Sequence, residues 1–166
     1  MKELLTQESI HVNYQCDETG WGALHYSSIN NHYDTTEYLI SKDADVNILT
    51  TDDLSMSPVF AASSAGHSDI VSLLINSGAN LNISGQTEIC PLQISCEAGH
   101  IDVVKTLASY CGCDLHQTDE YGSFPLYQAC GEGFDDIVQV QHGARGHETM
   151  FYPTSALLPT RIYKDS

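Results

Sequence analysis

The side chains of this chain that are best suited to chemistry belong to its cysteines and histidines. Cys111, Cys113 and His116 are the one group with the character of a zinc site, because thiolate and imidazole are ligands that Zn²⁺ prefers. The Cys-x-Cys spacing is, however, shorter than that of structural zinc sites, and no second ligand pair follows. The spacing therefore favours an irregular helix end, and we predict no bound metal.

The sequence contains no pattern typical of an enzyme. Gly-x-Ser-x-Gly, P-loop, Gly-x-Gly-x-x-Gly and His-Glu-x-x-His motifs are all missing from it. Gly131-Glu132-Gly133 falls at a turn between two expected helices. Catalysis also needs a base and its partner at a defined geometry, and nothing predicts such a pair. We therefore expect no catalytic residue, no cofactor and no enzyme activity.

Most of the histidines belong to a regular repeat. Gly-His or an equivalent pair recurs, with its second member at His32, His67, His100 and Phe134. The successive spacings of 35, 33 and 34 residues are nearly constant. A period in this range indicates an architecture of stacked repeats.

Other features recur in the same register. A start motif precedes each pair, and proline in three of its four copies suits the first turn of a helix. An amphipathic run follows the pair, with apolar residues at helical spacing, and Gly78 is placed to cap it in the left-handed conformation. Each copy is thus predicted to be a helix, a tight turn, a second helix and a polar loop. The start motifs are Gly22–His25, Ser57–Phe60, Cys90–Gln93 and Phe124–Tyr127.

This unit resembles the ankyrin repeat, which has a 33-residue period and a Thr-Pro-Leu-His start motif. No copy carries the full motif, so the resemblance depends on the whole period and covers residues 4–133. It implies an all-α solenoid of about four stacked helix-turn-helix units with short β-hairpin-like loops. It also implies that His25, at the histidine position of the family motif, links adjacent turns by hydrogen bonds.

The register divides the chain into an array at residues 1–144 and a divergent tail at residues 145–166. The array consists of a half repeat at 1–16, complete repeats at 17–49, 52–84 and 85–118, and an incomplete repeat at 119–144. The chain is thus expected to begin inside a repeat. Prolines at 153 and 159 exclude one continuous helix in the tail. The tail is either a makeshift cap over the fourth repeat or a disordered end.

The net charge of −16 bears on the kind of partner. It argues against nucleic acid and anionic membranes, which need a basic face, and it favours a basic protein. The alternative is that the carboxylates only solvate the loops. No signal peptide or apolar run of transmembrane length occurs, so we predict a cytoplasmic protein, with the nucleus as the alternative. Cysteines in such a protein are thiols, and Cys90, Cys96 and Cys130 are expected to fill the core.

The resemblance places the binding surface on the loop tips and on the exposed face of the first helices, which curvature makes concave. Tryptophan and tyrosine are favoured interface anchors. For Trp21 an alternative stays open, namely that it packs across neighbouring loops. The candidate loop-tip residues are Trp21, Met56, Ile89 and Tyr121, and those of the first-helix face are Tyr26, Ile29, Asn30, Ser64, Ile94, Glu97 and Glu132.

The resemblance also implies a modification, because ankyrin repeats are substrates of an asparaginyl hydroxylase at the position of Asn47 and Asn82. The favoured alternative is that these asparagines are present because each bonds its own backbone in the turn.

The predicted function is that of a protein-binding scaffold with an acidic concave surface. Two alternatives stay open. One is a substrate adaptor of a ubiquitin ligase, since residues 153–162 resemble the start of a SOCS box but lack its cysteine. The other is a regulatory fragment of a longer enzyme.

Overall fold

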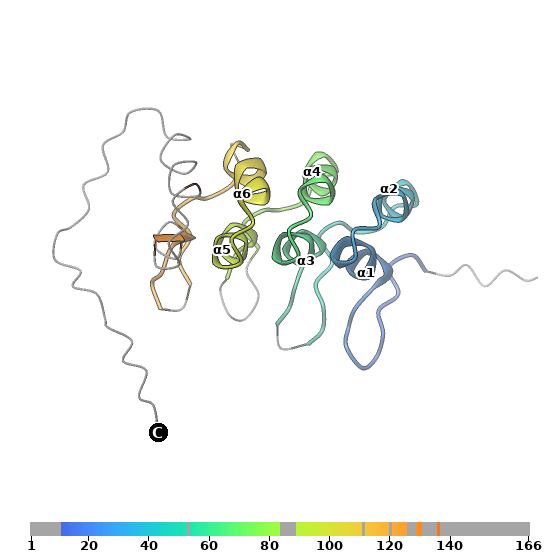
Figure 1. Ribbon diagram of the computed structural model, residues 1–166. Coiled ribbons are helices and arrows are strands. Elements are labelled where there is room, and N and C mark those ends of the chain that lie inside the picture. The colour runs from blue at the N-terminus through green and yellow to red at the C-terminus, as the bar shows by residue number, and fades with distance from the viewer. Residues whose placement is uncertain are drawn as a thin grey trace, which may run out of the picture.

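The computed structural model describes residues 11–52, 54–83, 89–110, 112–119, 121–125, 129–130 and 136. Over these residues the chain forms three helix pairs, and each predicted complete repeat contains one pair. The first helices lie side by side in one layer and the second helices in another (Figure 1). The predicted all-α solenoid is confirmed. The pairs are α1 (Ala23–Ile29) and α2 (Tyr33–Ser41), α3 (Pro58–Ser64) and α4 (Ser68–Asn76), and α5 (Pro91–Glu97) and α6 (Ile101–Ala108).

The helix boundaries follow from local chemistry. Pro58 and Pro91 occupy the first helical turn, as predicted, and the Ser57 hydroxyl caps α3 by accepting a hydrogen bond from the Phe60 N–H at 3.2 Å. The turn within the second repeat needs Gly66, whose φ is +81°. A Cβ atom there would also lie 2.8 Å from the His100 ring, so both the backbone and the neighbouring repeat require glycine.

The core lies between the two layers, and the second helices contribute to it unequally. Helix α4 buries four apolar side chains, whereas α2 buries only Thr36. The Thr36 hydroxyl donates to the Ser27 hydroxyl at 3.0 Å. The equivalent residues of the second repeat, Ala62 and Val71, are both apolar. The first repeat is therefore the more polar one. The largest fully buried apolar side chains are Ile70, Leu74, Leu92, Leu107, Val59, Val71, Val103 and Val104.

The turn histidines connect consecutive repeats. Nε2 of His67 lies 2.9 Å from the carbonyl oxygen of Ile29, and Nε2 of His100 lies 3.1 Å from that of Ser64. The last carbonyls of a helix have no partner within it. Each histidine thus satisfies a first-helix carbonyl of the preceding repeat, a role that the sequence analysis did not foresee.

The loop asparagines make a second set of links between repeats. Oδ1 of Asn47 accepts from the Asn80 N–H at 2.7 Å, and its Nδ2 donates to the Gly78 carbonyl at 3.2 Å. Asn82 makes the same two bonds to the third repeat, at 2.8 Å each. The prediction that these asparagines bond their own turn was wrong. The residue two positions earlier does so, as when Oδ1 of Asn80 accepts from the Asn82 N–H at 3.0 Å.

His25 ties the first helix to the following loop. Its Nδ1 accepts from the Gly22 N–H at 3.1 Å, so the ring proton is on Nε2. Nε2 then donates to the carbonyls of Ile48 at 3.1 Å and Met56 at 3.0 Å, which confirms the link implied by the resemblance. Gln93 holds the equivalent position in the third repeat, and its amide donates to a carboxylate oxygen of Asp119 at 2.9 Å.

Burial lowers the pKa of His25 below its ordinary value, and this outweighs the hydrogen bonds to Met56 and Ile48, which raise it. The unfolded chain therefore binds the proton first as the pH falls, and the stability that neutral His25 provides is present above pH 6.5 and is lost below it.

Two buried serine hydroxyls lack a partner among the described residues. Ser28 and Ser63 hold the same position in α1 and α3, and Oγ of each is buried with no hydrogen bond. Ser27, by contrast, donates to the Leu24 carbonyl and accepts from Thr36. A buried hydroxyl without a partner destabilises the folded state, because it has lost its bonds to water.

We expect Ser63→Ala to raise the free energy of unfolding by about 1 kcal/mol, because it removes an unpaired buried hydroxyl. Urea unfolding followed by circular dichroism measures the change. Ser27→Ala is the matched control, and its loss of two hydrogen bonds should lower stability by about 1 kcal/mol. Equal destabilisation by both substitutions would contradict this account.

We expect the free energy of unfolding to decrease when the pH is lowered from 7 to 5. The full decrease is about 1.4 kcal/mol for each pKa unit by which folding lowers the pKa of His25. His25→Gln should reduce this dependence, since an amide can donate to a loop carbonyl without titrating, as Gln93 does to the Ser123 carbonyl in the third repeat. Urea unfolding at both pH values tests this, with His32→Gln, at an exposed histidine, as the control. An unchanged pH dependence in His25→Gln would show that His25 is not responsible.

Candidate protein-binding surface

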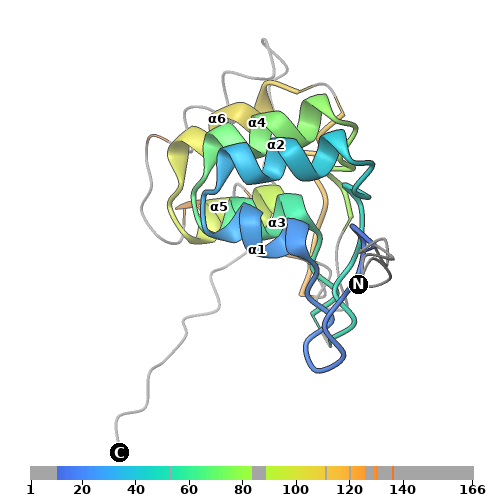
Figure 2. The same cartoon turned by 90° about the vertical axis from the view of Figure 1, so that its right-hand side faces the viewer.

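The predicted binding residues lie on the first-helix layer and on the loops beside it. Figure 2 looks along the stack and shows these loops extending from one end of the helices, on the side of the first-helix layer. The loop tips and helices α1, α3 and α5 therefore form adjoining parts of one surface, which we call the loop–helix surface.

The first loop is closed by its own backbone. The Cys16 N–H donates to the Trp21 carbonyl at 3.0 Å, and the Gly20 N–H donates to the Cys16 carbonyl at 2.7 Å. The amide of Gln15 donates to the Gly20 carbonyl and, at the end of the first complete repeat, to the Leu49 carbonyl, both at 2.6 Å. This loop places the exposed side chains of residues 17 and 18 at its tip.

Trp21 and Tyr26 form an aromatic pair at the base of this loop. Their ring centroids are 5.2 Å apart at an interplanar angle of 48°, and Trp21 also lies 5.8 Å from the His25 ring. Trp21 is half-buried, and its side chain helps to lower the pKa of Asp52 in the second loop, so packing across neighbouring loops accounts for part of its role. Tyr26 is 50% exposed and faces solvent beside it.

Asp52 organises the second loop. Its carboxylate accepts hydrogen bonds from the Thr50 hydroxyl at 2.6 Å, the Ser55 N–H at 3.1 Å and the Leu54 N–H at 3.2 Å. Desolvation raises the pKa of Asp52, but these bonds, together with a smaller contribution from the Trp21 side chain, outweigh it, and the net pKa is lowered. The carboxylate is therefore charged at neutral pH.

The other predicted residues differ in how accessible they are. Asn30 is exposed, but its amide donates to the Tyr26 carbonyl at 2.9 Å and so caps its own helix. Tyr121 is 83% exposed. Glu132 lies outside the described residues. The half-buried members are Ile29, Met56, Ser64, Ile89, Ile94 and Glu97.

Four other exposed tyrosines did not follow from the sequence. Tyr14, Tyr33, Tyr38 and Tyr110 are 64%, 41%, 61% and 42% exposed. Tyr33 and Tyr38 belong to α2, in the second-helix layer, and the polar character of α2 is the signal that could have pointed to them.

The cysteine predictions have mixed outcomes. Cys90 and Cys96 are buried in the core as predicted, but Cys130 is exposed, because among the described residues no further first helix follows to cover it. Burial, followed by the proximity of Cys90 and Asp114, raises the pKa of Cys113 to about 12, which disfavours the thiolate that zinc needs. Cys111 lies outside the described residues, within which no cluster of metal-ligating side chains occurs.

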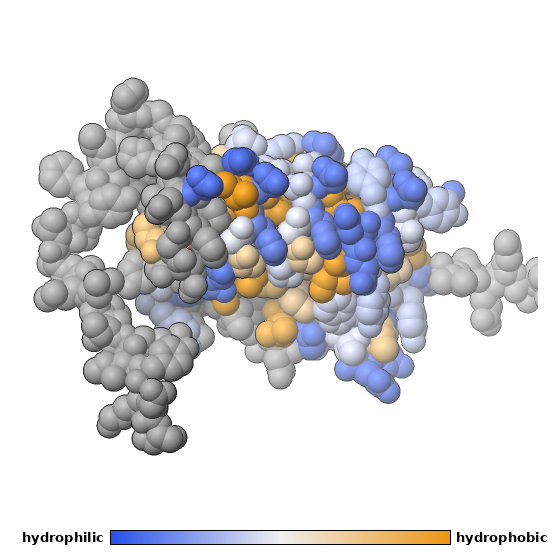
Figure 3. All heavy atoms as spheres, in the orientation of Figure 1, coloured by the Kyte–Doolittle hydropathy of each residue, from blue (hydrophilic) through white to orange (hydrophobic). Residues whose placement is uncertain are grey.

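The described lysines lie away from the loop–helix surface. Lys42, at the end of α2, lies over the Tyr38 ring at 5.4 Å, and Lys105 of α6 lies 3.8 Å from the Asp102 carboxylate. Hydrophilic residues cover much of the face in Figure 3, with hydrophobic areas scattered between them. None of the described helices combines the length and apolar character needed to cross a membrane.

Comparisons with known proteins agree with the repeated helix pairs. The chain is 32% identical over 108 residues to a glycerophosphocholine phosphodiesterase of Candida albicans, which covers 64% of this chain and 9% of that protein. It is 27% identical over 149 residues to the ankyrin repeat protein YahD of Escherichia coli, which covers 86% of this chain and 73% of that protein.

A third relative is named a probable E3 ubiquitin-protein ligase in Oryza sativa subsp. japonica. The identity is 38% over 63 residues, covering 38% of this chain and 12% of that protein. The chain thus spans most of the bacterial relative and a small part of the other two.

Two family models match the chain. A model of three ankyrin repeats matches residues 59–147, and a model of many ankyrin repeats matches residues 1–40 and 28–75. The first match alone covers more than half of the chain, and three helix pairs of the structure repeat in the register of the sequence period. This chain therefore belongs to the ankyrin-repeat family.

Proposed function

We propose that the loop–helix surface binds a protein partner whose contacting region is basic. Ankyrin repeats are in general protein–protein interaction modules, and membership of the family supports this class of function. The observation that carries the proposal is the exposure of Tyr26 and Tyr121 on a surface where the described residues include no lysine or arginine. Aromatic side chains of this kind are favoured interface anchors.

The distribution of charge supports a basic partner. Lys42 and Lys105, the two basic residues of the described part of the chain, both belong to the second-helix layer. Carboxylates at 17, 18, 52 and 119 lie on the loops without a described lysine, whereas those of the second helices, at 34, 37, 69 and 102, share their layer with both lysines. A surface of one sign steers an oppositely charged partner and raises its association rate.

Two alternatives keep some support from the relatives. Similarity to a probable E3 ubiquitin-protein ligase favours a substrate-binding role within a ubiquitin ligase. Similarity to a small part of a phosphodiesterase favours a regulatory segment of a larger enzyme. In each case the loop–helix surface would remain the part that contacts another protein. The cytoplasmic or nuclear location stays a prediction.

Hydroxylation of Asn47 or Asn82 stays a secondary prediction. Both side-chain amides already bond the backbone of the next repeat, so a hydroxylase would have to gain access to them by opening these links.

The pull-down experiment for this function uses immobilised chain and cell lysate, with bound proteins identified by mass spectrometry. We expect Tyr26→Ala combined with Tyr121→Ala to reduce capture of a wild-type partner at least about tenfold, because such anchors contribute about 2 kcal/mol or more at interfaces. Capture should also decrease with rising salt concentration.

Tyr38→Ala is the matched control, since it removes a tyrosine of similar exposure from the second-helix layer. Circular dichroism of each variant checks its helix content. Equal capture by wild type and the double variant would place the interface elsewhere. If the wild-type chain captured no protein from the lysate, this result would contradict the proposed function.

A further inference from the structure

Within the loop–helix surface, Trp21 packs against Tyr26 at the end of the first loop, which carries the exposed acids Asp17 and Glu18. We propose that this group of side chains binds an arginine side chain of the partner. The inference rests on the proposed function and adds the chemistry of one contact. Its occupant is argued from the exposure of the rings, the local excess of negative charge and the location of the described lysines.

The aromatic rings supply the first half of the site. Tyr26 is half exposed, and its ring is tilted against that of Trp21 with centroids 5.2 Å apart. The face of an aromatic ring attracts a cation within about 6 Å of its centroid, most strongly for tryptophan. His25, which lies beside Trp21, carries no competing charge, because its Nδ1 accepts a hydrogen bond from Gly22 and is therefore unprotonated.

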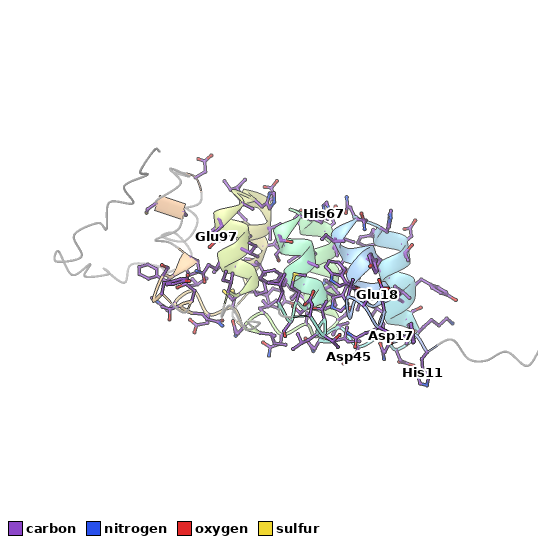
Figure 4. All side chains as sticks on the ribbon, turned by 90° about the horizontal axis from the view of Figure 1, so that it is seen from below. His11, Asp17, Glu18, Asp45, His67 and Glu97 are labelled. Carbon is purple, nitrogen blue, oxygen red and sulfur yellow. The ribbon has the colours of Figure 1, made fainter. Side chains whose placement is uncertain are left out.

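Carboxylates supply the second half. Asp17 and Glu18 are exposed at the tip of the loop that ends at Trp21, and the hydrogen bonds of Cys16 and Gln15 close that loop. Figure 4 views the stack from the loop side and labels both acids at the α1 end of the molecule. The Asp52 carboxylate, whose pKa the Trp21 side chain helps to lower, adds a further negative charge.

This combination favours arginine over lysine. The planar guanidinium stacks on an aromatic ring and donates two parallel hydrogen bonds to a carboxylate at the same time. The ammonium of lysine is compact and strongly hydrated, and it acts as a point charge. A site with two tilted rings and neighbouring carboxylates thus matches the shape of the guanidinium as well as its charge.

The described part of the chain does not fill this site with a cation of its own. Lys42 already lies over the Tyr38 ring at 5.4 Å in the other helix layer, and Lys105 lies beside Asp102. The Lys42 contact shows the same physical interaction made internally. At Tyr26 the corresponding ring is exposed and has no described basic residue beside it.

The test is a titration of ¹⁵N-labelled chain with N-acetyl-arginine amide, followed by NMR. Trp21 is the only tryptophan, so its indole N–H signal reports on the site without ambiguity. We expect a saturable shift with a dissociation constant on the order of 1–10 mM, as suits one exposed side-chain contact. N-acetyl-lysine amide should bind about threefold more weakly, and neutral N-acetyl-citrulline amide should leave the signal unmoved.

Variants separate the two halves of the site. Tyr26→Ala should weaken arginine binding about threefold or more, and Asp17→Asn with Glu18→Gln should weaken it and reduce its salt dependence. Tyr38→Ala, in the other layer, should leave it unchanged. Equal shifts with arginine and citrulline, or no effect of Tyr26→Ala, would overturn the proposed site.

The pull-down experiment separates this inference from the proposed function. Partner capture that needs Tyr26, together with no saturable arginine binding, would reject the arginine site and leave the function standing. Saturable arginine binding without any captured partner would support the arginine site and reject the proposed function.

Discussion

The structure depends on one constraint, which is that no repeat can satisfy its own backbone and bury its own apolar face. The first helices are seven residues long, so their last carbonyls are a large fraction of their polar groups. His67 and His100 supply donors to those carbonyls from the next repeat. Asn47 and Asn82 link the loops in the opposite direction, because each donates to a carbonyl of the following repeat. Stability is therefore shared between neighbours, as expected for a quasi-one-dimensional fold.

These links also decide which side chains are available for binding. The carbonyl of Met56 accepts a hydrogen bond from the His25 ring, and the Trp21 ring lies 5.8 Å from that same ring, so two of the predicted anchors are part of the loop framework. Rigid loops of this kind reduce the conformational entropy lost on association. Tyr26 and Tyr121 have large exposed surfaces on that framework, and they can contact a partner without a change in the fold.

The sequence was sufficient to predict the helix pairs and the turns at Gly66 and Gly78, which follow from residue types at fixed spacing. The link made by His25 was implied by the resemblance to the ankyrin repeat, whereas the links made by His67 and His100 were not predicted. The sequence did not predict the hydrogen-bond partner of each asparagine. Asparagine at this position is compatible with a bond to its own turn and with a bond to the next repeat. Only the distance between repeats, which brings the Asn80 N–H to 2.7 Å from Asn47, decides between them. The exposure of Cys130 likewise depends on whether another helix covers it.

The first repeat illustrates how such a fold can acquire a binding site. A repeat contacts only its neighbours, so its sequence can diverge without disturbing the rest of the stack. Here α2 buries only Thr36, which bonds to Ser27, and the same repeat carries Trp21, Tyr26 and the carboxylates of the first loop. Helices α4 and α6 bury apolar side chains instead. The second and third repeats thus provide the stable support, and the first repeat, with fewer packing requirements, has the greater freedom to specialise in recognition.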